Sequence, residues 1–265
     1  MLIGLLLAGF IARAQTPSAH FQDIKNYMIF YGQGQLDQLV KYDLVIIQPD
    51  SLSQPELHRL KAEGTLIVAY LSLGEVEPQR PWYGDGRFNS AWSLGRNPLW
   101  GSYWVDASQV GWQELMLSLA SEYIAMGFDG LFLDTIDTVN IFPQTKAGMI
   151  HLIERLDAHY PNSLLIQNRG LALLDDVLPY IDALMVESLS STYDFVQKDY
   201  VYVDNAGLAL ELSQFSKKTG LPVLSLDYAN SALMAESSRQ LALSYGFLPA
   251  VSEIWLDSIP NFGLE

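Results

Sequence analysis

Cysteine is absent from the 265-residue sequence, which excludes disulfide bonds, a thiolate nucleophile and a cysteine-ligated zinc site. Histidine is scarce: His58, His151 and His159 fall in predicted helices, and His20 precedes the first predicted strand. A metallohydrolase barrel would need histidine ligands at strand ends, and a serine hydrolase would need a G-x-S-x-G turn, which is also missing. We therefore expect neither a metal nor another cofactor.

Positive charge is also scarce, since 15 Lys and Arg residues stand against 30 Asp and Glu residues, a formal charge of −15. We expect no nucleic acid partner, because neutralising phosphates requires clustered basic side chains. A negatively charged cleft would instead concentrate neutral or cationic ligands, although an acidic surface also serves solubility alone.

Long hydrophobic runs are missing beyond the N-terminus, so no later segment reaches the roughly 20 residues of a membrane span. The apolar run Leu2–Ala12 has only about eleven residues, and Ala12-Arg13-Ala14 shows the small-x-small pattern of a signal-peptide cleavage site. No Lys or Arg precedes the run, and an uncleaved N-terminal anchor is the alternative. We predict a signal peptide over residues 1–14 and a secreted or periplasmic mature protein.

Residues 15–265 alternate short apolar runs with longer amphipathic stretches. Continuous apolar runs are typical of parallel strands that are buried on both faces. The eight predicted strands are Tyr27–Tyr31, Leu44–Ile47, Leu66–Leu71, Gly130–Leu133, Leu164–Ile166, Ala183–Val186, Pro222–Leu226 and Pro249–Ile254. The predicted helices are Gln54–Glu63, Trp112–Met126, Lys146–Tyr160, Leu208–Thr219 and Ala232–Tyr245, several of which end at a glycine. This pattern predicts one α/β domain, a (β/α)8 TIM barrel.

A doubly wound sheet is the competing architecture, but it usually has fewer strands and carries a glycine-rich phosphate loop. The nearest matches, Gly32-Gln33-Gly34 and Gly84-Asp85-Gly86, lack the third glycine and the lysine of such loops. We interpret both segments as turns, and the barrel is our prediction.

Polar side chains follow almost every predicted strand. In a parallel barrel the carboxyl ends of all strands lie on one rim, where loops build the active site. A ring of carboxylates there needs a ligand, because like charges held close together cost energy unless one is protonated or paired. We predict substrate-binding roles for six strand-end residues, Tyr31, Glu75, Gln167, Asn168, Asp227 and Tyr228. For Asp50, Asp137 and Asp257 we prefer capping of the next helix.

Two carboxylates form the predicted catalytic pair. Asp134 follows the run Phe128–Leu133, and Glu187 follows the buried run Ala183–Val186. Apolar walls would raise the pKa of Glu187, as a general acid requires. The alternatives are a helix cap for Asp134 and an ion pair with Arg169 or a cap for Glu187.

An Asp and a Glu at neighbouring strand ends match glycosidic cleavage, in which one carboxyl protonates the leaving oxygen while the other attacks the anomeric carbon or activates water. We predict retention, with Asp134 as nucleophile and Glu187 as acid and then base. Retention requires carboxyls about 5–5.5 Å apart, whereas inversion leaves about 6.5–9.5 Å for water. Gln167 and Asn168, on the strand between them, would bind sugar hydroxyls or orient Glu187. Asp129 lies at the entry end of its strand, where we expect a turn or cap.

Aromatic residues gather in the insert after the third strand, Val76–Val110, which is longer than a usual βα loop. Five of the six tryptophans lie in or beside it, namely Trp82, Trp92, Trp100, Trp104 and Trp112. Flat ring faces suit stacking on the C–H faces of sugars. We predict that the insert covers the barrel mouth, with Trp82 and Trp92 in substrate subsites and Trp104 and Trp112 in a satellite core.

Several segments together resemble the endo-α-1,4-polygalactosaminidase family, which is related to the hydrolase domain of the Pel exopolysaccharide system. The segments are Tyr70–Glu75, Gly127–Asp134, Gln167-Asn168 and Val186-Glu187, and the resemblance spans about Tyr27 to Asp257. One departure is Leu133-Asp134-Thr135, where the fungal form has Pro-Asp-Asn.

The resemblance implies a (β/α)8 barrel that cleaves α-1,4-linked, partly deacetylated galactosamine polymers without a metal. It implies a catalytic pair at Asp134 and Glu187, with Asp129 and Glu75 as further acidic motif positions. A cationic aminosugar polymer would also account for the charge of −15. The alternative is a non-catalytic polysaccharide-binding barrel in exopolysaccharide export or biofilm assembly. We expect a monomer.

Overall fold

The computed structural model describes residue 21 and residues 23–262, so the predicted signal peptide lies outside the described residues. Its main sheet has eight parallel strands in the order β1-β2-β3-β7-β8-β9-β12-β13. These strands are β1 (Tyr27–Phe30), β2 (Leu44–Ile47), β3 (Leu66–Ser72), β7 (Gly130–Asp134), β8 (Leu164–Asn168), β9 (Ala183–Glu187), β12 (Val223–Tyr228) and β13 (Leu248–Ser252). All eight predicted strands are confirmed to within two residues at either end.

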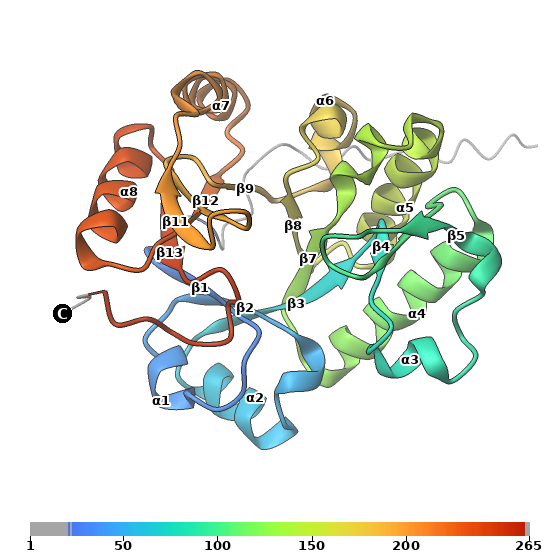
Figure 1. Cartoon of the computed structure of the whole chain (residues 1–265). Coiled ribbons are helices and arrows are strands. Elements are labelled where there is room, and N and C mark those ends of the chain that lie inside the picture. Colours follow the sequence, from blue (N-terminus) through green and yellow to red (C-terminus); the bar gives the residue numbers. More distant parts are fainter. Residues whose placement is uncertain (1–20, 22, 263–265) are drawn as a thin grey trace, which may run out of the picture.

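The sheet curves into a nearly closed barrel, and Figure 1 shows its strands as a ring with the helices around it. The last strand, β13, lies beside the first, β1. Just past these strands, the backbone N–H of Tyr31 donates to the carbonyl oxygen of Leu256 at 2.6 Å. The fold is therefore the predicted (β/α)8 barrel.

The five predicted helices are confirmed as α2 (Gln54–Ala62), α4 (Val110–Met126), α5 (Lys146–His159), α7 (Ala206–Thr219) and α8 (Ala232–Ser244). Two further connections contain only one-turn helices, α1 (Leu36–Leu39) after β1 and α6 (Leu174–Val177) after β8. Gly127 and Gly220 close α4 and α7 with φ angles of 110° and 77°, in the left-handed region that glycine adopts freely. Within the described part of the chain, no helix has the length and apolar character to cross a bilayer.

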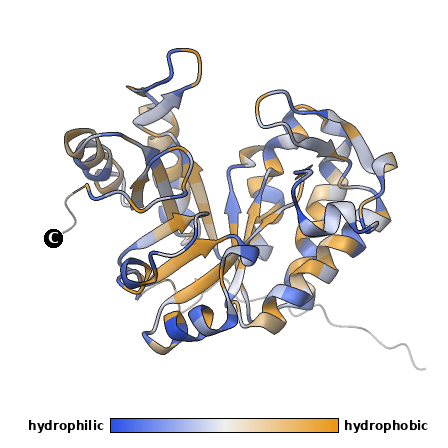
Figure 2. Cartoon of the chain, turned by 60° about the horizontal axis from the view of Figure 1, so that its bottom comes forward, coloured by the Kyte–Doolittle hydropathy of each residue, from blue (hydrophilic) through white to orange (hydrophobic). Residues whose placement is uncertain are grey.

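Alternation of side chains along the strands divides the core into two layers. Ile29, Val68 and Phe132 belong to the barrel interior, whereas Leu131 and Leu133 pack outward in the larger cluster that includes the helices. Both faces of each strand are covered, which is why the strand sequences are continuously apolar. Figure 2 shows the same division, with hydrophobic strands inside and hydrophilic colour on the outer helix faces.

Two additions follow barrel strands at the carboxyl rim. The insert after β3 contains α3 (Pro81–Gly84) and an antiparallel sheet of β4 (Glu75–Val76), β5 (Ser93–Arg96) and β6 (Tyr103–Val105), in the order β4-β6-β5. A hairpin of β10 (Ser191–Asp194) and β11 (Asp199–Tyr202) follows β9. In Figure 1 the insert lies beside α4, on the opposite side of the ring from the hairpin.

Candidate active site

The barrel interior becomes polar at its carboxyl rim. Asp134, Asn168, Glu187 and Tyr228 are the last residues of β7, β8, β9 and β12, which are neighbours in the sheet. Each follows, two positions later, an apolar side chain of the barrel interior. Because side chains alternate along a strand, all four point into the mouth of the barrel, where Tyr70 of β3 joins them. Four neighbouring strands thus deliver one polar group each to the same place.

A single amide nitrogen joins the two predicted catalytic carboxylates. Asn168 Nδ2 donates to Asp134 Oδ1 and to Glu187 Oε1, both at 2.7 Å. The remaining carboxylate oxygens accept from phenols, Asp134 Oδ2 from Tyr70 Oη at 2.7 Å and Glu187 Oε2 from Tyr228 Oη at 2.6 Å. Two bonds of 2.7 Å to one nitrogen limit the distance between the bridged oxygens to twice that length, 5.4 Å. The two carboxyls are close enough to act on one bond.

The surroundings of Glu187 favour its protonated form more than water does for a free carboxyl. Desolvation raises the pKa of Glu187, and the negative charge of Asp134 raises it further, against the hydrogen bonds from Tyr228 and Asn168. Desolvation likewise raises the pKa of the Tyr70 and Tyr228 phenols well above the usual value, so both stay neutral donors. A raised pKa is the direction of shift that a general acid requires.

The residue after each of three polar strand ends has a left-handed backbone. The φ angles are 59° at Thr135, 53° at Arg169 and 59° at Ser188, although none of these residues is glycine. Such conformations cost energy, especially for a β-branched residue, and are found at functional sites. Thr135 Oγ1 accepts the backbone N–H of Gly74 at 2.8 Å and lies 2.8 Å from Ser72 Oγ, which holds the turn in place. Asparagine adopts this backbone more readily than a β-branched residue such as threonine.

Two of the six predicted strand-end residues face away from the barrel interior. Gln167 is fully buried, and its Nε2 donates to the carbonyl oxygens of Arg169 and Gly170 at 2.8 and 3.3 Å. Asp227 accepts the backbone N–H groups of Ser190 and Ser191 at 2.7 and 3.0 Å. Gln167 thus braces the loop after its own strand β8, and Asp227 of β12 braces the loop after the neighbouring strand β9. The substrate-binding roles of both residues stay predictions.

The other acidic motif positions form their hydrogen bonds with residues outside the pair. Glu75 accepts from Asn97 Nδ2 at 3.1 and 3.2 Å and from Ser102 Oγ, all within the insert. Asp129 lies at the opposite rim, where it accepts from Lys61 Nζ at 2.7 Å and from the backbone N–H of Ile67 at 2.9 Å. Asp129 thus ties α2 to β3 and β7, in agreement with the expected turn or cap role.

The insert tryptophans divide differently from our expectation. Trp112 is fully buried in the core, as predicted, but Trp82 is buried with it, at a ring distance of 6.1 Å. Trp92 is half-buried and packs on Trp112 at 6.3 Å. The structure brings neither Trp82 nor Trp92 to the carboxylates, and their subsite roles stay predictions.

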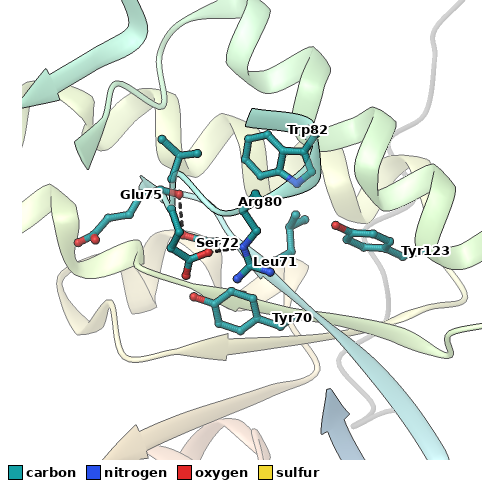
Figure 3. A pocket seen from close by; sticks show the side chains of 9 residues that line it. Tyr70, Leu71, Ser72, Glu75, Arg80, Trp82 and Tyr123 are labelled. Carbon is teal, nitrogen blue, oxygen red and sulfur yellow. Dashed lines mark hydrogen bonds and ion pairs between the residues drawn. The ribbon is translucent and has the colours of Figure 1, made fainter. Parts of the chain in front are cut away.

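Sequence reasoning missed Tyr70 and Arg80. Figure 3 shows the Arg80 guanidinium over the Tyr70 ring, 5.1 Å from its centre, beside a small cavity of about 10 Å³ that Trp82 also lines. Half-buried Tyr31, a predicted substrate-binding residue, packs edge-on against Tyr70 at 5.2 Å. Tyr70 is the first residue of the motif Tyr70–Glu75, and this motif was the sequence signal that could have identified it.

Among the described residues, no group of three His, Cys, Asp or Glu side chains could hold a metal ion.

Solved structures with the same fold come from a bacterium and a fungus. The glycoside hydrolase domain of PelA from Pseudomonas aeruginosa superposes with a TM-score of 0.79 at 24% identity, covering 89% of this chain and 97% of that one. Ega3 from Aspergillus fumigatus, in complex with galactosamine, gives a TM-score of 0.71 at 17% identity, covering 88% of this chain and 91% of that one. At these identities the likeness establishes the barrel fold.

Sequence comparisons identify the family. An uncharacterized protein of Deinococcus radiodurans is 27% identical over 245 residues, which cover 86% of this chain and 79% of that protein. The family model described as Glycoside-hydrolase family GH114 matches residues 11–258. The chain therefore belongs to glycoside-hydrolase family GH114 and is a glycosidase.

Proposed function

We propose that this glycosidase hydrolyses α-1,4-linked, partly deacetylated galactosamine polysaccharide, with Asp134 as nucleophile and Glu187 as acid and base. The motif resemblance supports this substrate, as does the fungal structure of the same fold in complex with galactosamine. A formal charge of −15 suits a polymer that carries ammonium groups. The predicted secreted or periplasmic location would bring the enzyme to an exopolysaccharide.

The bridge formed by Asn168 is the observation that carries the mechanism. It holds one oxygen of Asp134 and one of Glu187 at most 5.4 Å apart, twice the 2.7 Å bond length. Retaining enzymes place their carboxyls about 5–5.5 Å apart, whereas inverting enzymes need about 6.5–9.5 Å. The separation supports attack by Asp134 itself rather than by a water molecule.

In the first step, Glu187 gives its proton to the glycosidic oxygen while an Asp134 oxygen attacks the anomeric carbon. The bond to the leaving sugar breaks, and a covalent ester joins the remaining sugar to Asp134. In the second step, a water molecule attacks the same anomeric carbon through its oxygen and gives a proton to the Glu187 carboxylate. Asp134 leaves, and two successive displacements restore the original configuration.

The test is incubation of the protein with partly deacetylated α-1,4-galactosaminan, followed by a reducing-end assay and NMR of the first product. We expect new reducing ends in the α configuration, before mutarotation. A first product in the β configuration would contradict the covalent intermediate. Polymer binding without new reducing ends would contradict the enzyme proposal and favour a polysaccharide-binding barrel.

Activity is expected to fall on the alkaline side as Glu187 loses its proton, because the raised pKa of Glu187 sets that limb. The bond from Tyr228 Oη stabilises the ionised carboxylate, so Tyr228→Phe should raise the pKa of Glu187 further. We expect the alkaline limb of the kcat/KM profile to move upward by about half a pH unit. Tyr245→Phe, in a residue remote from the pair, is the control, and an unmoved limb in Tyr228→Phe would contradict the assignment.

A further inference from the structure

Exposed aromatic side chains from three loops, which follow the barrel strands β3, β9 and β13, meet one another. Trp100 and Trp255 are 52% and 59% exposed, and Phe195 contacts both of them. The ring distances are 5.4 Å for Trp100–Phe195 and 6.4 Å for Phe195–Trp255, both edge-to-face. We call these three residues the aromatic bridge.

The sheet order places the bridge across the strands that carry the carboxylates. Trp100 lies in the turn between β5 and β6 of the insert after β3, Phe195 in the turn of the hairpin after β9, and Trp255 just past β13. Between β3 and β9 lie β7 and β8, which end in Asp134 and Asn168, and between β9 and β13 lies β12. Figure 1 shows the insert and the hairpin on opposite sides of the ring. The aromatic bridge therefore spans the rim at which the candidate active site opens.

The bridge is more than loop packing, because its tryptophans keep half or more of their surface in solvent. The apolar side chains Leu99 and Val196, beside Trp100 and Phe195, are 59% and 93% exposed. Contiguous exposed apolar surface on a soluble protein commonly marks a binding site.

One motif carboxylate holds Trp100 in position. Glu75 accepts from Asn97 and Ser102, the residues on either side of the turn that carries Trp100. The backbone N–H of Asn97 also donates to the carbonyl oxygen of Ser102 at 2.9 Å, and Ser102 is buried. A ring that is already held in place loses less conformational entropy when it binds a ligand.

We propose that the aromatic bridge is the surface on which an aminosugar polymer lies beyond the sugars at the cleavage point, with Glu75 as a positioning residue for Trp100. This inference rests on the proposed function. Aromatic rings offer flat apolar area to sugar C–H faces, and tryptophan faces also attract ammonium groups through cation–π interactions. In this proposal Trp100 and Trp255 bind the polymer, whereas Trp82 and Trp92 pack on Trp112.

The first test measures binding of long, partly deacetylated galactosaminan and of the matching disaccharide to the Glu187→Gln protein, in which turnover does not consume the ligand. We expect Trp100→Ala and Trp255→Ala each to weaken binding of the long polymer about tenfold and to affect the disaccharide much less. Leu233→Ala, an exposed apolar residue on α8, is the control and should bind as the parent does. Unchanged polymer binding in the Trp100→Ala, Trp255→Ala double variant would overturn the proposal.

The role of Glu75 is tested by KM in the active enzyme. Glu75→Ala should raise KM for the long polymer about as much as Trp100→Ala does, with little effect on kcat, and Glu75→Gln should restore it in part because its amide oxygen still accepts from Asn97. In the Trp100→Ala, Glu75→Ala double variant, KM for the long polymer should be little higher than in Trp100→Ala alone. If the two substitutions raised KM independently, so that their free-energy effects added, the positioning role of Glu75 would be overturned.

The two proposals fail separately. If polymer binding depends on Trp100 and Trp255 but the wild-type protein releases no reducing ends, the proposed hydrolysis is contradicted and the proposed role of the aromatic bridge is supported. If the wild-type protein hydrolyses the polymer and both tryptophan variants bind it as the parent does, the role of the aromatic bridge is contradicted and the hydrolysis is supported.

Discussion

Glu187→Gln and Asp134→Asn are each expected to lower kcat on galactosaminan by at least about 10²–10⁴-fold. Glutamine has no proton of suitable acidity for the leaving oxygen, and asparagine is too weak a nucleophile to form the covalent ester. Asp129→Asn is the matched control, because Asp129 binds Lys61 and Ile67 at the opposite rim. We expect this control to keep its rate on galactosaminan within several-fold of the wild type.

Azide distinguishes the two roles. In Asp134→Ala, azide can occupy the space of the lost nucleophile and attack once, which gives a glycosyl azide of inverted, β configuration. In Glu187→Ala, the ester on Asp134 still forms from a substrate with a good leaving group, and azide then attacks it to give the retained, α product. Product NMR reads the difference, and the reverse pattern would exchange the roles of Asp134 and Glu187.

Loss of activity in Glu187→Gln should not come from unfolding. The pKa of Glu187 is raised in the folded protein, so ionisation of this group opposes folding. The contribution of protonated Glu187 to the free energy of unfolding is fully present below the pKa of Glu187 in the unfolded chain. It is lost as pH rises through the pKa of Glu187 in the folded protein. Glutamine avoids that loss, so we expect the variant to melt about 2–4 °C above the wild type at pH 8 and closer to it at pH 4. A lower Tm at pH 8 would contradict the assigned pKa direction.

The second large effect is expected at Asn168. Asn168→Ala removes the N–H donor that lies between two carboxylates. We expect kcat to fall by about 10²–10³-fold, the size of loss typical of removing one oxyanion-hole donor. Without the Asn168 donor the charges of Asp134 and Glu187 face each other, so the pKa of Glu187 should rise and the alkaline limb should move upward. Kinetic pH profiles of the variant measure both effects.

Asn168→Asp should be more damaging than Asn168→Ala, because it places a third carboxylate within hydrogen-bond distance of the other two. Asn230→Ala, an exposed amide at the same rim, is the control for a general effect of losing an amide. Wild-type kcat and an unmoved alkaline limb in Asn168→Ala would show that the bridge has no role in catalysis.

The eight strands and five long helices could be predicted because each depends on local sequence. Runs such as Leu44–Ile47 are apolar throughout, and helices α4 and α7 end at Gly127 and Gly220, so local rules give the elements and their order. Parallel strands put their carboxyl ends on one rim, and this was enough to place Asp134 and Glu187 there.

The contrast between Gln167 and Asn168 was not predictable. Both faces of a barrel strand are apolar, so the sequence has no alternation from which to tell the inward position from the outward one. The structure puts Asn168 between the carboxylates and turns Gln167 toward the loop carbonyls. The left-handed backbone at Thr135 and Ser188 gave no signal either, because neither residue is glycine.

The sequence by itself determined the barrel, its strand order along the chain and the two strand ends that carry Asp134 and Glu187, because these depend on composition within short segments. Only the tertiary structure decided which aromatic rings are covered: Trp82 packs on Trp112, whereas Trp100 meets Phe195 at the surface. Irregular loops have no periodicity, so the burial of their side chains depends on contacts with residues far away in the chain.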